Sequence, residues 1–238
     1  MRHRRAVSFV IRTAPRLRMT DLAARPRPRI LISGGAGGVG YACARALTGR
    51  GADLILCDTD GTELTRTSEE VGGYSRYCDV GSEASVEVYA ADIAAAYDSL
   101  DVLINAAGAG YVRTLGMVRM TRAMLPLLRR ARGNRLIINV APLGGFSRND
   151  RMFPYAGSRE CFQRLSEATA EQVRGSGIKV VMLTPRLVTD ASANAPRPEQ
   201  PYRFQRVDDW DLAQRIAAIV AQAVPLTAQQ PNIGSRRA

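Results

Sequence analysis

Short apolar runs alternate with longer segments of helical periodicity along most of this chain. The runs are four to six residues long and are often bounded by glycine, proline or acidic residues, which is typical of strands buried in a parallel sheet. The expected strands cover residues 29–33, 54–57, 74–78, 101–104, 135–140 and 179–183. Apolar residues in the longer segments recur every three or four positions, which predicts helices. The expected helices cover residues 39–50, 61–71, 85–97, 117–130, 155–175 and 212–224.

The alternation of strands and helices predicts an α/β fold in which helices cover both faces of a doubly wound parallel sheet. Neither an internal repeat nor a linker interrupts this pattern, so we expect a single domain over residues 29–224. Residues 1–28 are expected to form a disordered basic tail, and residues 225–238 a polar, proline-containing tail. Open parallel sheets bind ligands at the carboxyl ends of their strands, and candidate chemistry should therefore follow directly after each strand.

Composition supports a folded domain and locates most of the charge in the first residues. The 238 residues are 46% hydrophobic and 23% charged, close to the average of globular proteins. The net charge is +11, of which residues 1–29 carry +8 and the rest of the chain only +3. A nucleic-acid interface would require basic residues clustered on a folded face with stacking aromatic residues, and the tail offers only Phe9. We therefore expect no nucleic-acid partner.

The start of the chain and its cysteines favour a cytoplasmic protein. Met19 opens a segment that resembles an ordinary start, so residues 1–18 are interpreted first as an extension of the reading frame, second as disorder and third as an organelle-targeting peptide. The apolar runs are shorter than the roughly 20 residues that cross a bilayer, which predicts no membrane association. The four cysteines form no C-x-x-C pair and His3 is the only histidine, so we expect no metal site and reduced, buried thiols.

A glycine-rich turn, Ser33–Gly40, lies directly between the first expected strand and the first expected helix. Glycines at this place let the backbone approach a pyrophosphate, which would rest on the N–H groups of the helix start. Asp58 ends the next expected strand, 18 residues after Gly40, where its carboxylate can accept hydrogen bonds from an adenosine ribose. The same charge would repel the 2′-phosphate of NADP. We therefore expect a Rossmann-type site that binds NAD, with NADP the less favoured cofactor.

Five motifs follow the expected strands and helices in a defined order and spacing. They are Ser33-Gly34-x-x-x-Gly38-Val39-Gly40, Asp58, Cys78-Asp79-Val80, Asn105-Ala106-Ala107-Gly108 and Tyr155-x-x-x-Arg159. This set resembles the short-chain dehydrogenase/reductase family from about Ile30 to Asp190. The resemblance implies that residues 79–80 contact the adenine and that the 105–108 turn supports the sheet and contacts the cofactor ribose. The cofactor-binding residues that it implies are Ser33, Gly34, Gly38, Val39, Gly40, Asp58, Asp79, Val80, Asn105, Ala106, Gly108, Tyr155, Arg159 and Thr189.

The resemblance also implies a catalytic centre, and this sequence departs from the family pattern there. Tyr155 matches the tyrosine that acts as general acid/base, while Arg159 replaces the lysine that lowers the pKa of that tyrosine and binds the nicotinamide ribose. Arginine can stabilise a tyrosinate but cannot release a proton. Pro142 replaces the serine that polarises the substrate carbonyl. The supporting asparagine has no match, and the chain is shorter than the family pattern around Leu115–Met117, where the front half of a helix is expected.

Two functions from different classes remain open. The first is an oxidoreductase that transfers a hydride between NAD and a small-molecule carbonyl or secondary alcohol, with Tyr155 as acid/base and Arg159 as its electrostatic partner. The second is a catalytically weakened relative that binds a dinucleotide and acts as a sensor or partner protein. No motif predicts the substrate. The resemblance allows a homo-oligomer, although the final strand that helps form the dimer interface in relatives has no recognisable counterpart after Val224.

Overall fold

A six-stranded parallel sheet forms the centre of the computed structural model, which describes residues 27–108, 110–141, 153–184 and 209–226. Its strands are β1 (Arg29–Ser33), β2 (Asp53–Asp58), β3 (Tyr74–Tyr77), β4 (Val102–Asn105), β5 (Arg135–Val140) and β6 (Ile178–Leu183). They lie in the order β3-β2-β1-β4-β5-β6, and every neighbouring pair is parallel. The predicted doubly wound α/β fold is thereby confirmed, with its switch point between β1 and β4.

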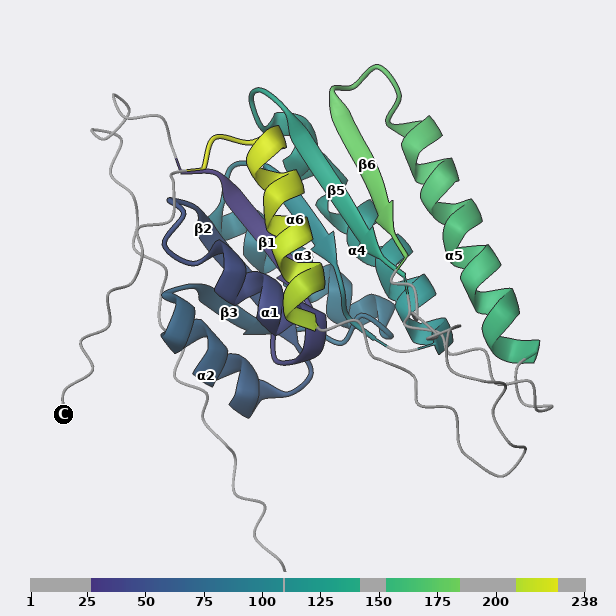
Figure 1. Cartoon of the computed structure of the whole chain (residues 1–238), viewed down its shortest axis with the longest axis horizontal. Coiled ribbons are helices and arrows are strands. Elements are labelled where there is room, and N and C mark those ends of the chain that lie inside the picture. Colours follow the sequence, from purple (N-terminus) through teal and green to yellow (C-terminus); the bar gives the residue numbers. More distant parts are fainter. Residues whose placement is uncertain (1–26, 109, 142–152, 185–208, 227–238) are drawn as a thin grey trace, which may run out of the picture.

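Helices cover both faces of the sheet, as Figure 1 shows. They are α1 (Gly38–Leu47), α2 (Gly61–Val71), α3 (Glu83–Ala96), α4 (Gly110–Arg130), α5 (Phe153–Gln172) and α6 (Asp209–Ala223). In this view α1 and α6 lie in front of the sheet, and α3 and α4 lie behind it. α5 packs against α4 and β6 at one end of the sheet. The carboxyl ends of the strands therefore form one edge that is supported from both sides.

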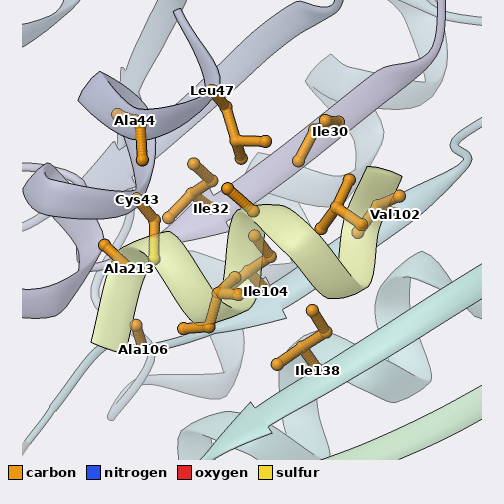
Figure 2. Packing of buried hydrophobic residues seen from close by; sticks show 14 of the residues in the cluster. Ile30, Ile32, Cys43, Ala44, Leu47, Val102, Ile104, Ala106, Ile138 and Ala213 are labelled. Carbon is orange, nitrogen blue, oxygen red and sulfur yellow. The ribbon is translucent and has the colours of Figure 1, made fainter. Parts of the chain in front are cut away.

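Alternate residues of the central strand β1 point into two separate hydrophobic clusters. Ile30 and Ile32 pack against α1 and α6, and Figure 2 shows Ile32 near Cys43 and Ile30 near Leu47. Leu31 packs on the opposite face with residues of α3 and α4. The side chains of Ile30, Leu31 and Ile32 are all fully buried. Burial on both faces explains why the strands appear as continuous apolar runs in the sequence.

α2 begins and ends at the residues that the sequence predicts, because a capping group stands at each end. The Asp60 side chain accepts hydrogen bonds from the N–H groups of Thr62 and Glu63, which begins the helix. Gly72 ends it in the left-handed conformation, with φ of 68°. Both caps are visible in the sequence as an acidic residue before the helix and a glycine after it.

The prediction for α4 is wrong at its beginning. The helix begins at Gly110 rather than at residue 117, so Leu115–Met117 lies inside it and is not the site of a missing front half. Only residues 106–109 connect β4 to α4. The early turns pack closely on the segment after β3, since a Cβ on Gly116 would lie 2.6 Å from Val80 Cγ2. Tertiary packing of small residues, rather than apolar periodicity, therefore stabilises this part of the helix.

Several predictions concern residues outside the described ranges. Residues 1–26 and 227–238 of the two predicted tails belong to this group, as do Pro142 and Thr189. Within the described ranges, none of the helices combines the length and apolar character that a membrane crossing requires.

Candidate functional site

The glycine-rich turn links the end of β1 to the start of α1 at the carboxyl edge of the sheet. The N–H groups of Gly34 and Gly35 donate to the Cys57 carbonyl at 2.8 and 3.1 Å, which connects the turn to β2. Gly34 has φ of +83°, and a Cβ there would lie 2.9 Å from Ala107 Cα. The turn therefore requires glycine at this position both for its conformation and for its contact with the segment after β4.

Two further glycines of this turn, Gly40 and Gly37, differ in how closely other atoms pack around them. A Cβ on Gly40 would lie 2.6 Å from the Gly34 carbonyl carbon and closer still to its oxygen, so the first turn of α1 rests directly on the backbone of the glycine turn. A Cβ on Gly37 would meet no atom within 4 Å. The contact at Gly40 holds the helix start in place, while the open side at Gly37 leaves room for a phosphate group near the helix N–H groups.

Asp58 ends β2 and holds the glycine turn with its carboxylate. Its Oδ2 accepts a hydrogen bond from the Ala36 N–H at 3.0 Å, and its Oδ1 accepts one from the Thr59 N–H at 2.7 Å. These bonds fix the orientation of the side chain beside the turn. An ionised carboxylate in this place can accept hydrogen bonds from ribose hydroxyls and repels a phosphate.

A cavity of about 370 Å³ opens beside these groups. Two acidic residues line it after β2, Asp58 and Asp60, and Arg113 lines it from α4. The remaining lining residues come from the glycine turn and from the segment after β4. The structure thus brings six of the predicted cofactor-binding residues around one cavity, namely Gly34, Gly38, Val39, Asp58, Ala106 and Gly108.

Other predicted cofactor-binding residues shape the edge of the sheet without lining this cavity. Ser33 is buried, and its Oγ accepts hydrogen bonds from the N–H groups of residues 106–107 at 3.2 and 3.3 Å. Asp79 holds the turn after β3, because its Oδ1 accepts a hydrogen bond from the Gly81 N–H at 2.8 Å. Val80 is buried in the core. Contact of these residues with a cofactor stays a prediction.

A buried polar network lies beneath the ends of β4 and β5, and only one of its members is among the predicted site residues. Asn105 donates from Nδ2 to Asn139 Oδ1 at 2.8 Å and to Thr121 Oγ1 at 3.1 Å. Asn139 donates from its own Nδ2 to Ser166 Oγ at 3.1 Å. All four residues are buried. The network joins β4, β5, α4 and α5, and its low-dielectric surroundings strengthen each hydrogen bond.

Asn139→Leu is expected to lower the free energy of unfolding by about 2–6 kcal/mol, since two buried polar groups each lose a partner at a cost of about 1–3 kcal/mol. Asn139 is fully buried, and its loss removes one partner each from Asn105 and Ser166. Chemical denaturation of the purified protein measures the change. Gln163→Leu is the control, because Gln163 is exposed and donates to Glu167 on the surface of α5. Similar losses in the two variants would contradict this role of the network.

Tyr155 and Arg159 lie four residues apart near the beginning of α5. This spacing places the two residues one turn apart on the same side of a helix, as the sequence predicts. Their side chains lie outside the part of the chain that the structure describes. Their position relative to the cavity therefore stays a prediction.

All four cysteines are free thiols, and three of them are buried as predicted. Burial, followed by the nearby Asp209 carboxylate, raises the pKa of the Cys43 thiol to about 12, which makes it a poor nucleophile. The prediction is wrong for Cys161, which is exposed on α5 because its neighbour Phe162 takes the inward-facing position. Across the described ranges, no group of three or more His, Cys, Asp or Glu side chains is placed to hold a metal ion.

A parallel α/β sheet with a glycine-rich turn at its switch point defines a dinucleotide-binding class of protein. Residues 28–201 match the family model described as short chain dehydrogenase. The chain therefore belongs to the short-chain dehydrogenase/reductase family, an oxidoreductase family, as its motifs predict.

Relatives of this chain include L-fucose dehydrogenase of Bos taurus, 25% identical over 198 residues that cover 73% of each chain. Dehydrogenase/reductase SDR family member 7B of Danio rerio is 30% identical over 205 residues, which cover 72% of this chain and 66% of the relative. A short chain dehydrogenase/reductase from Burkholderia phymatum, solved in complex with NAD, has a TM-score of 0.67 and 22% identity over 83% of this chain and 86% of that one. A metagenomic short-chain oxidoreductase in complex with NADP has the same TM-score and identity, over 85% and 94%. Both solved structures share the fold of this chain.

Proposed function

We propose that this protein is an oxidoreductase that transfers a hydride between NAD and a small-molecule carbonyl or secondary alcohol. The observation that carries the proposal is the cavity at the carboxyl edge of the sheet, where the glycine turn, Asp58 and the segment after β4 meet. Family membership supports the class of reaction. We further propose that residues 29–224 form the catalytic domain.

The residues around the cavity fit a nicotinamide dinucleotide. The open backbone at Gly37 and the N–H groups at the start of α1 suit a pyrophosphate, and Asp58 suits the hydroxyls of an adenosine ribose. Ala106 and Gly108 would lie beside the second ribose. The bound cofactor would supply or accept the hydride. Two carboxylates at the adenosine end, Asp58 and Asp60, favour NAD over NADP.

Tyr155 would hold the proton that the substrate oxygen gains or loses. The charge of Arg159, one helical turn later, would lower the pKa of this tyrosine, because a nearby cation favours the tyrosinate. Pro142 has neither a hydroxyl nor an N–H group, so it cannot donate to the substrate oxygen. This loss is the feature that favours the second candidate, a dinucleotide-binding relative that acts as a sensor or partner protein.

A cytoplasmic location is part of the proposal. The thiols of Cys43, Cys57 and Cys78 are buried and unpaired, and such thiols stay reduced in the cytoplasm. Small molecules diffusing in that compartment are the substrates that we expect.

Binding of NADH to the full chain tests the proposal. Trp210 is the only tryptophan of the chain. Its neighbour Asp209 lies close to the glycine turn, because a Cβ added to Gly38 would be 3.8 Å from Asp209 Oδ2. We therefore expect bound NADH to quench Trp210 emission, with a Kd below about 1 mM. If millimolar NADH causes no quenching of Trp210 and its own fluorescence does not shift, both candidate functions are overturned. If NADH binds but no alcohol or ketone is turned over, only the second candidate function, a sensor or partner protein, remains.

Asp58→Asn is expected to increase the affinity for NADPH at least about tenfold relative to NADH, which corresponds to about 1.4 kcal/mol. The substitution removes the negative charge that would face a 2′-phosphate and keeps an oxygen that can accept from the Ala36 N–H. Titrations of NADH and NADPH followed by Trp210 fluorescence measure the ratio.

Asp60→Asn is the matched control for this prediction. Asp60 also lines the cavity, but its carboxylate accepts from the N–H groups that begin α2, and asparagine is an equally good cap. We expect a smaller change in the NADPH to NADH ratio. An unchanged ratio in Asp58→Asn, or a larger change in Asp60→Asn, would contradict the assignment of Asp58 to the adenosine ribose.

A further inference from the structure

Arg113 bridges the ends of two neighbouring strands at the edge of the cavity. Its Nε donates to the Gly108 carbonyl at 2.7 Å, and its Nη1 donates to the Val140 carbonyl at 3.4 Å. Gly108 follows β4, and Val140 is the last residue of β5. Arg113 is also one of the residues that line the cavity. Two backbone hydrogen bonds therefore hold a positively charged group beside it.

The charged groups that line the cavity are separated along the sheet. Asp58 ends β2 and Asp60 follows it, whereas Arg113 lies between the ends of β4 and β5. β1 lies between β2 and β4, so a spacing of ~4.8 Å per strand puts the two ends of the cavity about 10–14 Å apart. Arg113 is the only basic side chain among the lining residues that the structure describes. The cavity therefore has an acidic end and a basic end.

The two ends of the cavity would bind different parts of the reacting molecules if the proposed function is right, and the inference about Arg113 rests on that function. Asp58 would bind the adenosine ribose, and the glycine turn after β1 would bind the pyrophosphate. The nicotinamide half would then extend over β4 towards β5, where the substrate must meet it. A cation between β4 and β5 therefore faces the substrate end of the cavity.

We propose that Arg113 binds a carboxylate of the substrate, so that the substrates are oxo acids or hydroxy acids rather than neutral ketones or alcohols. A guanidinium presents its donors in one plane, and this geometry matches the two oxygens of a carboxylate. The bonds to Gly108 and Val140 order the side chain before the substrate arrives, which reduces the entropy lost on binding. The pyrophosphate of the cofactor is the other anion that enters this cavity, and the experiment separates the two.

Matched acids and esters test this assignment in the full chain. Pyruvate, acetoacetate and levulinate are each compared with their methyl esters, both for binding to the protein–NADH complex by fluorescence and for oxidation of NADH. We expect at least one acid to bind about 10- to 100-fold more tightly than its ester, the range expected for a hydrogen bond to a charged group. Arg113→Gln is expected to abolish this preference and to change the Kd of NADH by a smaller factor than it changes the Kd of the acid.

Arg119→Gln is the matched control. Arg119 is another arginine of α4, and its Nη1 donates to the Gly81 carbonyl at 2.8 Å, but it does not line the cavity. This variant should keep the acid preference of the wild type. Arg113→Lys is the second variant in case Arg113→Gln does not fold. It keeps the charge without the planar donors, and should therefore reduce the preference only in part.

An acid preference that survives Arg113→Gln overturns the proposal, as does the lack of any acid preference in the wild type across all three pairs. Weaker NADH binding with an unchanged acid preference would assign Arg113 to the pyrophosphate and would also overturn it. If acid binding depends on Arg113 while no ligand is turned over, the role of Arg113 is supported and the proposed reaction alone fails.

Discussion

Gly40→Ala is expected to weaken NADH binding at least about 100-fold and to lower the thermal unfolding midpoint by about 2–12 °C. A Cβ at this position would lie 2.6 Å from the Gly34 carbonyl carbon and 3.2 Å from the Gly35 nitrogen, so α1 and the glycine turn would have to move apart. Overpacking of this kind costs about 1–3 kcal/mol. The movement would also misplace the N–H groups that bind the pyrophosphate, and each bond to a charged group contributes about 1.5–3 kcal/mol. NADH titration and a thermal melt measure the two effects.

Gly37→Ala provides the control within the same turn. A Cβ on Gly37 meets no atom within 4 Å, and φ of −166° is extended backbone that alanine adopts without strain. The unfolding free energy of this variant should therefore lie within about 0.5 kcal/mol of the wild type. Equal stability of Gly40→Ala and Gly37→Ala would show that the turn does not pack on α1 as described.

The sequence predicts the fold most accurately where local chemistry marks the ends of an element. β1, α2 and β5 have the predicted bounds because turn residues or caps stand at their ends. α4 begins seven residues before its predicted start, since its first turns carry little apolar periodicity. Their helical conformation depends instead on contacts such as that of Gly116 with Val80, which are distant in the sequence. Patterns within one segment do not reveal such packing.

The same distinction explains which parts of the candidate site were predictable. Gly34, Gly38 and Asp58 follow directly after expected strands, and the parallel sheet brings the ends of those strands together. Arg113 and Asn139 carry no local signal, because their roles arise only when β4, β5 and α4 meet. Asn139, for example, contacts a residue 34 positions away. The predicted site therefore contained the acidic end of the cavity and lacked its basic end.

Tyr155→Phe is expected to lower kcat about 10²- to 10⁴-fold, the range that general acid–base catalysis contributes. The substitution removes only the hydroxyl that would exchange a proton with the substrate oxygen, so the affinity for NADH should change far less. Steady-state kinetics on the best substrate of the acid and ester panel, together with NADH titration, measure both quantities. Tyr41→Phe is the control, because the hydroxyl of Tyr41 on α1 donates to the Glu70 carboxylate of α2 at the surface, at 3.1 Å.

The double substitution Pro142→Ser and Arg159→Lys tests whether residues 142 and 159 assist Tyr155 as the acid/base group. A positioned donor contributes about 10²- to 10³-fold to the rate, so we expect the double substitution to raise kcat at least about tenfold in the chain that retains Tyr155. Residues that act as a unit have non-additive effects, and the same substitutions should therefore gain almost nothing in the Tyr155→Phe background. Equal gains in both backgrounds would mean that the serine and lysine assist another acid/base group. Unchanged activity in Tyr155→Phe alone would exclude this tyrosine from the proton transfer.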